Sequence, residues 1–281
     1  MRFVALLLAC LLAVPLAAQQ SPSPPGMTEI AYGSAPRQRL DFLPAAASHR
    51  APLVVFVHGG AWVVGDKGMA AHMAVHVRGQ GYAFASLNYR LVPDADPRRQ
   101  AEDVAAAIAV LVRDADELGI DPGRILLIGH SAGAHLAALV GTDPSYLAAH
   151  RVPLSALRGV VLLDSAAYDV PALVLRSGPV ARRLYVRAFG EDPDFQARVS
   201  PTLHAASPNA GRFLLLHIAS RPEESGAQSL QLAASLRAAG TPAEVVSVDN
   251  THLEIFQRFG QPGHVATERT DAFARDVFAD R

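Results

Sequence analysis

The chain has 281 residues, of which 50% are hydrophobic and 18% are charged, and its formal net charge at pH 7 is −1. This composition is that of a globular protein with a full apolar core, and α/β folds of this length commonly form one domain. Nucleic-acid binding is disfavoured, because no basic block supplies the positive charge that neutralises phosphates.

The first 18 residues have the pattern of a signal peptide, with Arg2 before an apolar run at 3–16 and the small residues Leu-Ala-Ala at 16–18. A run of about 14 apolar residues is shorter than the roughly 20 that span a bilayer, so the pattern favours cleavage near Gln19 over a membrane anchor. It predicts a secreted or periplasmic protein. A lipoprotein signal at Cys10, the only cysteine, stays open as an alternative, although the apolar run before it is short.

Residues 19–27 contain the Ser-Pro-Ser-Pro-Pro-Gly stretch and predict a flexible linker before a catalytic domain at 28–281. Within this domain, short apolar runs alternate with longer Ala/Leu-rich stretches. The runs are residues 53–57, 83–87, 125–128, 160–163, 213–216 and 243–248. The alternation predicts an α/β fold, with a mostly parallel sheet covered by helices on both faces.

A glycine-rich segment, His58-Gly59-Gly60-Ala61-Trp62, follows the first of these runs. Such a loop can turn its backbone N–H groups toward one point, and Gly60 and Ala61 are candidates for stabilising an oxyanion. A glycine-rich β-turn without a chemical role is the alternative.

The clearest helix is predicted at residues 97–118, where apolar residues recur at helical spacing and Gly119 follows.

The segment Gly129-His130-Ser131-Ala132-Gly133 lies between an apolar run and a helix-like stretch at 134–140. Gly-x-Ser-x-Gly in a turn from strand to helix is typical of a nucleophilic serine, because glycines let the two elements approach and leave the hydroxyl exposed. This context predicts Ser131 as the nucleophile and the N–H of Ala132 as a third oxyanion donor.

Several strings together resemble the bacterial esterase branch of the α/β-hydrolases, which includes hormone-sensitive-lipase-like, feruloyl-esterase-like and kynurenine-formamidase-like enzymes. The strings lie at residues 58–62, 88–91, 102–104, 119–122 and 129–136. The resemblance runs from about residue 53 to 278. It implies the α/β-hydrolase fold with a small cap insertion, and hydrolysis of a small carboxylic ester through an acyl-enzyme on Ser131, with no metal or cofactor. An arylformamidase-type amidase and a non-catalytic binding protein of the same fold are the alternatives.

The order of the resembled family implies a catalytic histidine after the last core strand, and His252 stands four residues past the run at 243–248. His264 is the nearby competitor. His72 and His76 have a spacing that suits zinc, but the sequence lacks the glutamate of His-Glu-x-x-His, so a plain helix face is favoured there.

The third member of a triad is less clear, because Arg221 stands where related esterases have aspartate. Arginine cannot accept the histidine N–H. We therefore expect Glu223 to serve as the acid, with Glu224 and then Asp164 as alternatives. The alternative for both glutamates is a solvated acidic pair at a helix start, where acidic residues favour the helix dipole.

Residues 165–207 are less regular and are expected to cap the site, with Arg176, Arg182, Arg183 and Arg187 on one helix. These arginines suit either a solvated helix face or an acidic substrate.

Trp62, Tyr89 and Tyr168 are candidate walls of an acyl or aryl pocket, and core packing is the alternative.

Overall fold

In the computed structural model, residues 24–46, 50–206 and 208–279 are described. They form an eight-stranded sheet in the order β1-β2-β4-β3-β5-β6-β7-β8. β1 (Thr28–Ala31) and β2 (Arg39–Leu43) run antiparallel to their neighbours, and strands β3 to β8 are parallel. The predicted signal peptide lies outside the described residues, and so does most of the predicted linker.

All six apolar runs form strands of the parallel part of the sheet, as predicted. These strands are β3 (Ala51–Val57), β4 (Ala83–Leu87), β5 (Ile120–His130), β6 (Leu157–Leu163), β7 (Phe213–Ile218) and β8 (Ala243–Val248). Successive side chains of β3 point to opposite faces, so Val55 joins one hydrophobic cluster and Val54 the other. Both faces are buried, which explains why these strands are apolar throughout.

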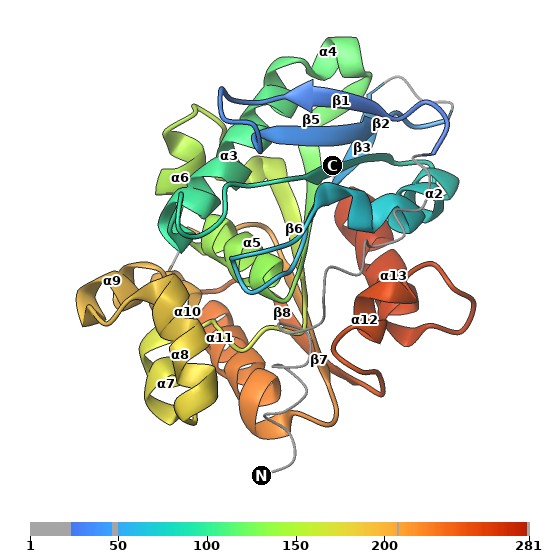
Figure 1. Ribbon diagram of the computed structural model, residues 1–281. Helices are drawn as coiled ribbons and strands as arrows, with labels where there is room; N and C mark the ends of the chain where they lie inside the picture. The colour runs from blue at the N-terminus through green and yellow to red at the C-terminus, as the bar shows by residue number, and fades with distance from the viewer. Residues whose placement is uncertain (1–23, 47–49, 207, 280–281) are drawn as a thin grey trace, which may run out of the picture.

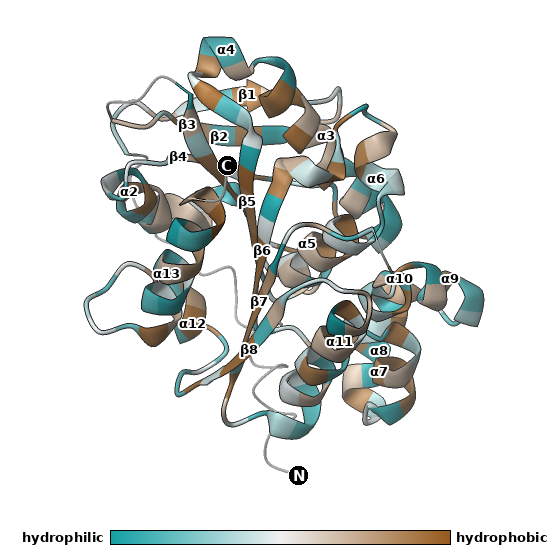
Figure 2. Ribbon diagram, turned by 180° about the vertical axis from the view of Figure 1, so that it is seen from behind, coloured by the Kyte–Doolittle hydropathy of each residue, from teal (hydrophilic) through white to brown (hydrophobic). Residues whose placement is uncertain are grey.

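Helices cover both faces of the sheet (Figure 1). α3 (Pro97–Arg113), α5 (Ala132–Thr142) and α11 (Ala227–Ala238) pack on one face, and α2 (Ala71–Gly79) and α13 (Val265–Ala279) on the other. In Figure 2 the hydrophobic colour is concentrated on the strands between these two layers. The shorter elements are η1 (Lys67–Ala70), α4 (Ala115–Leu118), α6 (Ser145–Ala148), η2 (Leu154–Ala156), η3 (Pro222–Gly226) and α12 (Glu254–Gln257).

The helix predicted at residues 97–118 is in fact two helices, α3 and α4. Asp114 lies between them, and its backbone leaves the helical region at φ −96° and ψ 17°. Its carboxylate pairs with the neighbouring Arg113. Gly119 then ends α4 in the left-handed conformation, at φ 68°. The predicted end of the helical segment is therefore right, and its continuity is wrong.

The expected cap insertion between β6 and β7 consists of α7 (Val170–Arg176), α8 (Pro179–Phe189), α9 (Pro193–Arg198) and α10 (Pro201–His204). The four arginines do not share one helix: Arg176 ends α7 and the other three lie on α8. Ser177 and Gly178 separate the two helices, and Pro179 stands in the first turn of α8, where its missing N–H costs no helical bond. Among the described residues, no helix is long and apolar enough to cross a membrane.

Candidate active site

Ser131 lies in the turn between β5 and α5, with a strained φ of 54°. Two backbone contacts require the flanking glycines. A Cβ on Gly129 would lie 2.2 Å from the carbonyl oxygen of Gly133, and a Cβ on Gly133 would lie 2.1 Å from that of Val57. The predicted strand, sharp turn and helix are confirmed.

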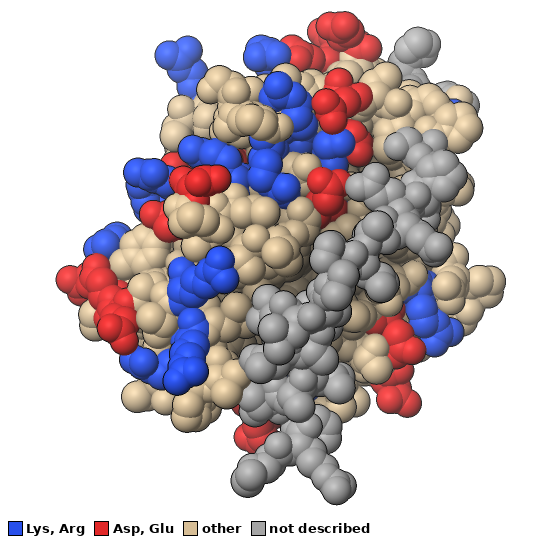
Figure 3. Space-filling model, in the orientation of Figure 1, with Lys and Arg blue, Asp and Glu red and all other residues tan. Residues whose placement is uncertain are grey.

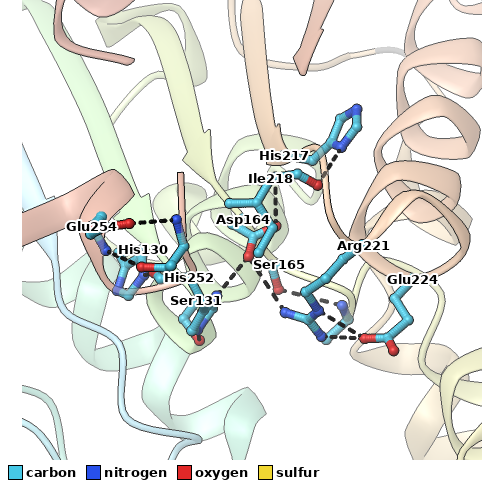
Figure 4. A network of polar contacts seen from close by, with 12 residues as sticks. His130, Ser131, Asp164, Ser165, His217, Ile218, Arg221, Glu224, His252 and Glu254 are labelled. Atoms are coloured by element: carbon cyan, nitrogen blue, oxygen red, sulfur yellow. Dashed lines mark hydrogen bonds and ion pairs between the residues drawn. The ribbon is translucent and has the colours of Figure 1, made fainter. Parts of the chain in front are cut away.

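A continuous hydrogen-bonded chain joins Ser131, His252 and Asp164 (Figure 4). The Nε2 atom of His252 lies 2.9 Å from Ser131 Oγ, and its Nδ1 lies 2.6 Å from Asp164 Oδ2. An ionised carboxylate only accepts hydrogen bonds, so Nδ1 carries the hydrogen and Nε2 presents its lone pair to the serine hydroxyl. The structure thus places the predicted nucleophile and the predicted base in contact.

The carboxylate beside His252 belongs to Asp164, so the expectation that Glu223 takes this place is wrong. β5 and β6 are neighbours, and their register pairs His130 with Leu163. Ser131 and Asp164 are therefore the next residues along adjacent strands. Glu223 follows β7, one strand farther away, and its side chain is exposed. The one sequence feature that could have identified Asp164 is its position as an acidic residue directly after a buried strand.

Asp164 is held rigidly in the core of the site. Its side chain is fully buried. Its N–H donates to the carbonyl of Leu216 at 2.8 Å, and the N–H of Ile218 donates to its Oδ1 at 3.2 Å. Burial by itself raises the pKa of this carboxyl, but the hydrogen bond and charge of His252, together with the charge of Arg221, lower the pKa well below its usual value. Asp164 is therefore ionised throughout the neutral range.

The loop that carries His252 is fixed at two points. Thr251 and Glu254 form a reciprocal capping box, with N···O distances of 2.9 and 3.2 Å. His130 Nε2 also lies 2.8 Å from the carbonyl oxygen of His252 and donates to it. The competing base candidate, His264, is buried and bonds to Thr267 at 2.8 Å, so it does not take part in this chain.

Two of the three predicted oxyanion donors lie beside Ser131, and the third, Gly60, is not part of the cavity lining. Ala61 and Ala132 line one cavity with Ser131. The N–H of Ala132 is in the first turn of α5, where no intrahelical acceptor exists and the helix dipole favours negative charge. Gly60 shapes the turn: its φ is 125°, and its carbonyl accepts hydrogen bonds from the N–H groups of Val63 and Val64.

The cavity has a volume of about 40 Å³, and α8 forms part of its roof. Leu184 and Tyr185 contribute from this helix, and the sequence interpretation missed both. Trp62 lines the wall as predicted. Its indole N–H donates to His135 Nδ1 at 3.2 Å, and its ring packs edge-on against Phe189 with centroids 4.6 Å apart. The full lining is Ala61, Trp62, Ser131, Ala132, Asp164, Ser165, Ala166, Ala167, Leu184, Tyr185, Arg221 and His252.

Tyr89 and Tyr168 are not walls of this cavity, contrary to the prediction. Tyr89 is fully buried, stacks on the ring of His58 at 4.4 Å and donates its hydroxyl to the His58 carbonyl at 3.0 Å. Tyr168 is fully buried in the larger hydrophobic cluster. Burial raises the pKa values of both Tyr89 and Tyr168 well above the usual value of a phenol, so both side chains stay neutral. Core packing, the alternative reading, explains both.

The histidine pair on α2 makes contacts with other elements. His72 Nε2 lies 3.0 Å from the carbonyl oxygen of Phe256, and His76 Nε2 lies 3.0 Å from the carboxylate of Asp271. Within the part of the chain that the structure describes, no group of three or more His, Cys, Asp or Glu side chains is arranged to hold a metal ion.

Three buried histidines should make the fold sensitive to acid. Burial lowers the pKa of His58 to about 4, of His130 to about 3 and of His135 to about 4. In the unfolded chain each titrates near pH 6.5, so between about pH 6.5 and 4 the unfolded state binds more protons. Stability should fall as the pH falls through this window, by up to about 1.4 kcal/mol per pH unit for each histidine.

Urea unfolding measured from pH 7 to pH 4 tests this expectation. His135→Gln should reduce the slope of unfolding free energy against pH, and the exposed His150→Gln should leave it unchanged. A free energy of unfolding that is constant from pH 7 to pH 5 would contradict the assignment.

With this geometry established, comparisons with known proteins place the chain among esterase-like relatives. Residues 40–150 match the BD-FAE family model. The isoprenylcysteine alpha-carbonyl methylesterase of Arabidopsis thaliana is 28% identical over 242 residues, covering 81% of this chain and 56% of that protein. The kynurenine formamidase of Danio rerio is 30% identical over 115 residues, covering 41% and 38%. The matches to the first curated relatives span between 25% and 56% of those proteins' own length.

A solved structure agrees over nearly the whole chain. Esterase B of Lactobacillus rhamnosis, inhibited by a tributyrin phosphonate, superposes with a TM-score of 0.78 at 21% sequence identity, covering 98% of this chain and 94% of that one. The chain has the α/β-hydrolase fold, and the resemblance to the esterase branch of that fold is confirmed.

Proposed function

We propose that this protein is a serine hydrolase that cleaves carboxylic esters through an acyl-enzyme on Ser131. His252 serves as general base, and Asp164, in place of the expected Glu223, serves as the acid of the triad. The observation that supports this most directly is the continuous chain from Ser131 Oγ through His252 to Asp164, at 2.9 and 2.6 Å, beside a cavity. The esterase names of the relatives point the same way.

In the first half of the reaction, Ser131 Oγ attacks the ester carbonyl carbon and its proton passes to His252 Nε2. The resulting imidazolium keeps its Nδ1–H bonded to the Asp164 carboxylate, which stabilises the positive charge. The backbone N–H groups of Ala61 and Ala132 stabilise the negative oxygen of the tetrahedral intermediate. When the intermediate collapses, the C–O bond to the alcohol breaks and the alcohol oxygen takes the proton from His252.

In the second half, water replaces the alcohol. His252 removes a proton from the water as it attacks the acyl carbon, and a second tetrahedral intermediate forms at the same place. Its collapse breaks the bond to Ser131 Oγ, which recovers its proton from His252 and releases the carboxylic acid.

Amide hydrolysis is the second candidate, favoured by the similarity to kynurenine formamidase. The same residues would act, with a nitrogen leaving group that takes its proton from His252. The two candidates differ in the substrate alone, so a parallel assay of p-nitrophenyl esters, feruloyl esters and N-formylkynurenine separates them.

Labelling with a fluorophosphonate tests the serine hydrolase itself. We expect one equivalent of probe on Ser131 of the folded protein, because an activated serine attacks phosphorus as it attacks a carbonyl carbon. Peptide mass mapping locates the adduct. Folded protein that takes up no probe would instead support a binding protein that has kept the fold without the activity.

A further inference from the structure

Arg221 brings a positive charge into the wall of the candidate active site. It directly precedes η3, and it stands where the resembled esterases carry their acid. Its side chain is 19% exposed and lines the same cavity as Ser131 and Tyr185. A mostly buried guanidinium in a substrate cavity needs negative partners, because removing a charge from water without one is costly.

Two carboxylates face this guanidinium, and neither fully satisfies it (Figure 4). Asp164 Oδ2 is 3.4 Å from Nη1 and already accepts the short hydrogen bond from His252. Glu224 accepts from Nε at 2.8 Å and from Nη2, and its side chain is 60% exposed. Counting only partners among the described residues, these contacts engage three of the five N–H groups of the guanidinium. Glu224 is thus a solvent-exposed counter-ion of Arg221.

The cap adds charge of the same sign near the cavity. Residues 170–189, which span α7 and α8, contain four arginines and no lysine, aspartate or glutamate. Arg182 pairs with Glu191, just past α8, at 3.2 Å, which offsets part of this positive charge. Figure 3 shows basic side chains gathered over the part of the surface where Figure 1 places α8. The same helix lines the cavity through Leu184 and Tyr185. Exposed charges of one sign near a site raise the local concentration of ions of the opposite sign.

We propose that Arg221 is a specificity-determining residue, and that the preferred substrates are esters that carry a carboxylate close to the scissile bond. The substrate carboxylate binds the guanidinium in place of Glu224, and the exposed arginines of α7 and α8 favour its approach. This inference rests on the proposed esterase activity and specifies the substrate class.

Two matched ester pairs test the inference. Methyl hydrogen succinate and its terminal amide, methyl succinamate, differ in a charge on the acyl side. O-acetylglycolate and O-acetylglycolamide differ in a charge on the alcohol side. The measured quantity is the ratio of kcat/KM for the anionic ester to that for its neutral partner, which we expect to exceed one for at least one pair.

Arg221→Met should lower this ratio about tenfold, mainly through KM for the anionic ester, because a charge-assisted hydrogen bond is lost. Arg221→Lys should retain most of the preference. Glu224→Gln removes the competing carboxylate and should raise the ratio. Arg113→Met, in an exposed pair with Asp114 on the far end of α3, is the matched control and should change neither ester. The part of the preference due to Arg221 should persist in about 0.5 M NaCl, since buried contacts are screened less than exposed ones.

Equal losses for both members of a pair in Arg221→Met would overturn the inference and identify Arg221 as a residue that only positions Asp164. A wild-type ratio of one or less in both pairs would also overturn it. If Arg221→Met does not fold, Arg221→Lys and the exposed Glu224→Gln decide: a ratio unchanged in Glu224→Gln refutes competition for the guanidinium. Failure of the esterase activity itself is distinguishable, because then the neutral esters are not cleaved either.

Discussion

Replacing Ser131 with alanine should lower kcat for ester hydrolysis by at least about 10⁴-fold, because no other group at the turn can form the acyl-enzyme. The fold should persist. Alanine removes only the hydroxyl, and the strained backbone of the turn is held by Gly129 and Gly133, which do not change. Steady-state kinetics on a p-nitrophenyl ester, with circular dichroism as the check of folding, measures the effect.

The matched control is Ser165→Ala, which removes a hydroxyl from the same cavity wall outside the hydrogen-bonded chain. We expect it to keep kcat within about fivefold of the wild type. A folded Ser131→Ala protein with more than about a tenth of the wild-type kcat would refute the nucleophile.

Replacing Asp164 with asparagine should lower kcat by at least about 10²-fold. The carboxylate holds the Nδ1–H of His252 and stabilises the imidazolium that forms as Ser131 loses its proton. An isosteric amide offers no charge, and it can donate to Nδ1 and select the wrong tautomer. The pH dependence of kcat/KM, measured beside kcat, reports whether the titration of the base has changed.

The variants Glu223→Gln and Glu224→Gln test whether Asp164 or one of these two glutamates is the acid of the triad. Both side chains are exposed, and Glu224 bonds to Arg221. For a neutral ester each variant should retain kcat within about fivefold of the wild type. If Glu223→Gln destroyed activity while Asp164→Asn stayed near the wild type, the role assigned to Asp164 would be wrong. If all three variants stayed active, Ser131 and His252 would act as a dyad.

The sequence by itself determined the parallel sheet and the turn that carries Ser131. Strands buried on both faces are apolar throughout, so all six were recognisable as runs. The strained turn of Ser131 excludes a side chain at residues 129 and 133, so its glycines were recognisable too. The first two strands, β1 and β2, were missed because they lie at the antiparallel edge, where a half-exposed strand leaves a weaker pattern: β1 has no buried residue.

Only the tertiary structure decided which carboxylate faces His252. The position of the acid in the resembled esterases, on the loop after β7, favoured Glu223, but a triad is assembled by the sheet. The order β5-β6-β7 and the pairing of His130 with Leu163 bring Asp164 beside Ser131. The same holds for the candidate aromatic walls of the pocket. The sequence gives no feature that separates Trp62, Tyr89 and Tyr168, since each is a large aromatic residue that suits either a pocket wall or the core. In the structure Trp62 lines the cavity, whereas both tyrosines are buried in the core. The neighbours that surround each side chain in the fold decide which way it faces.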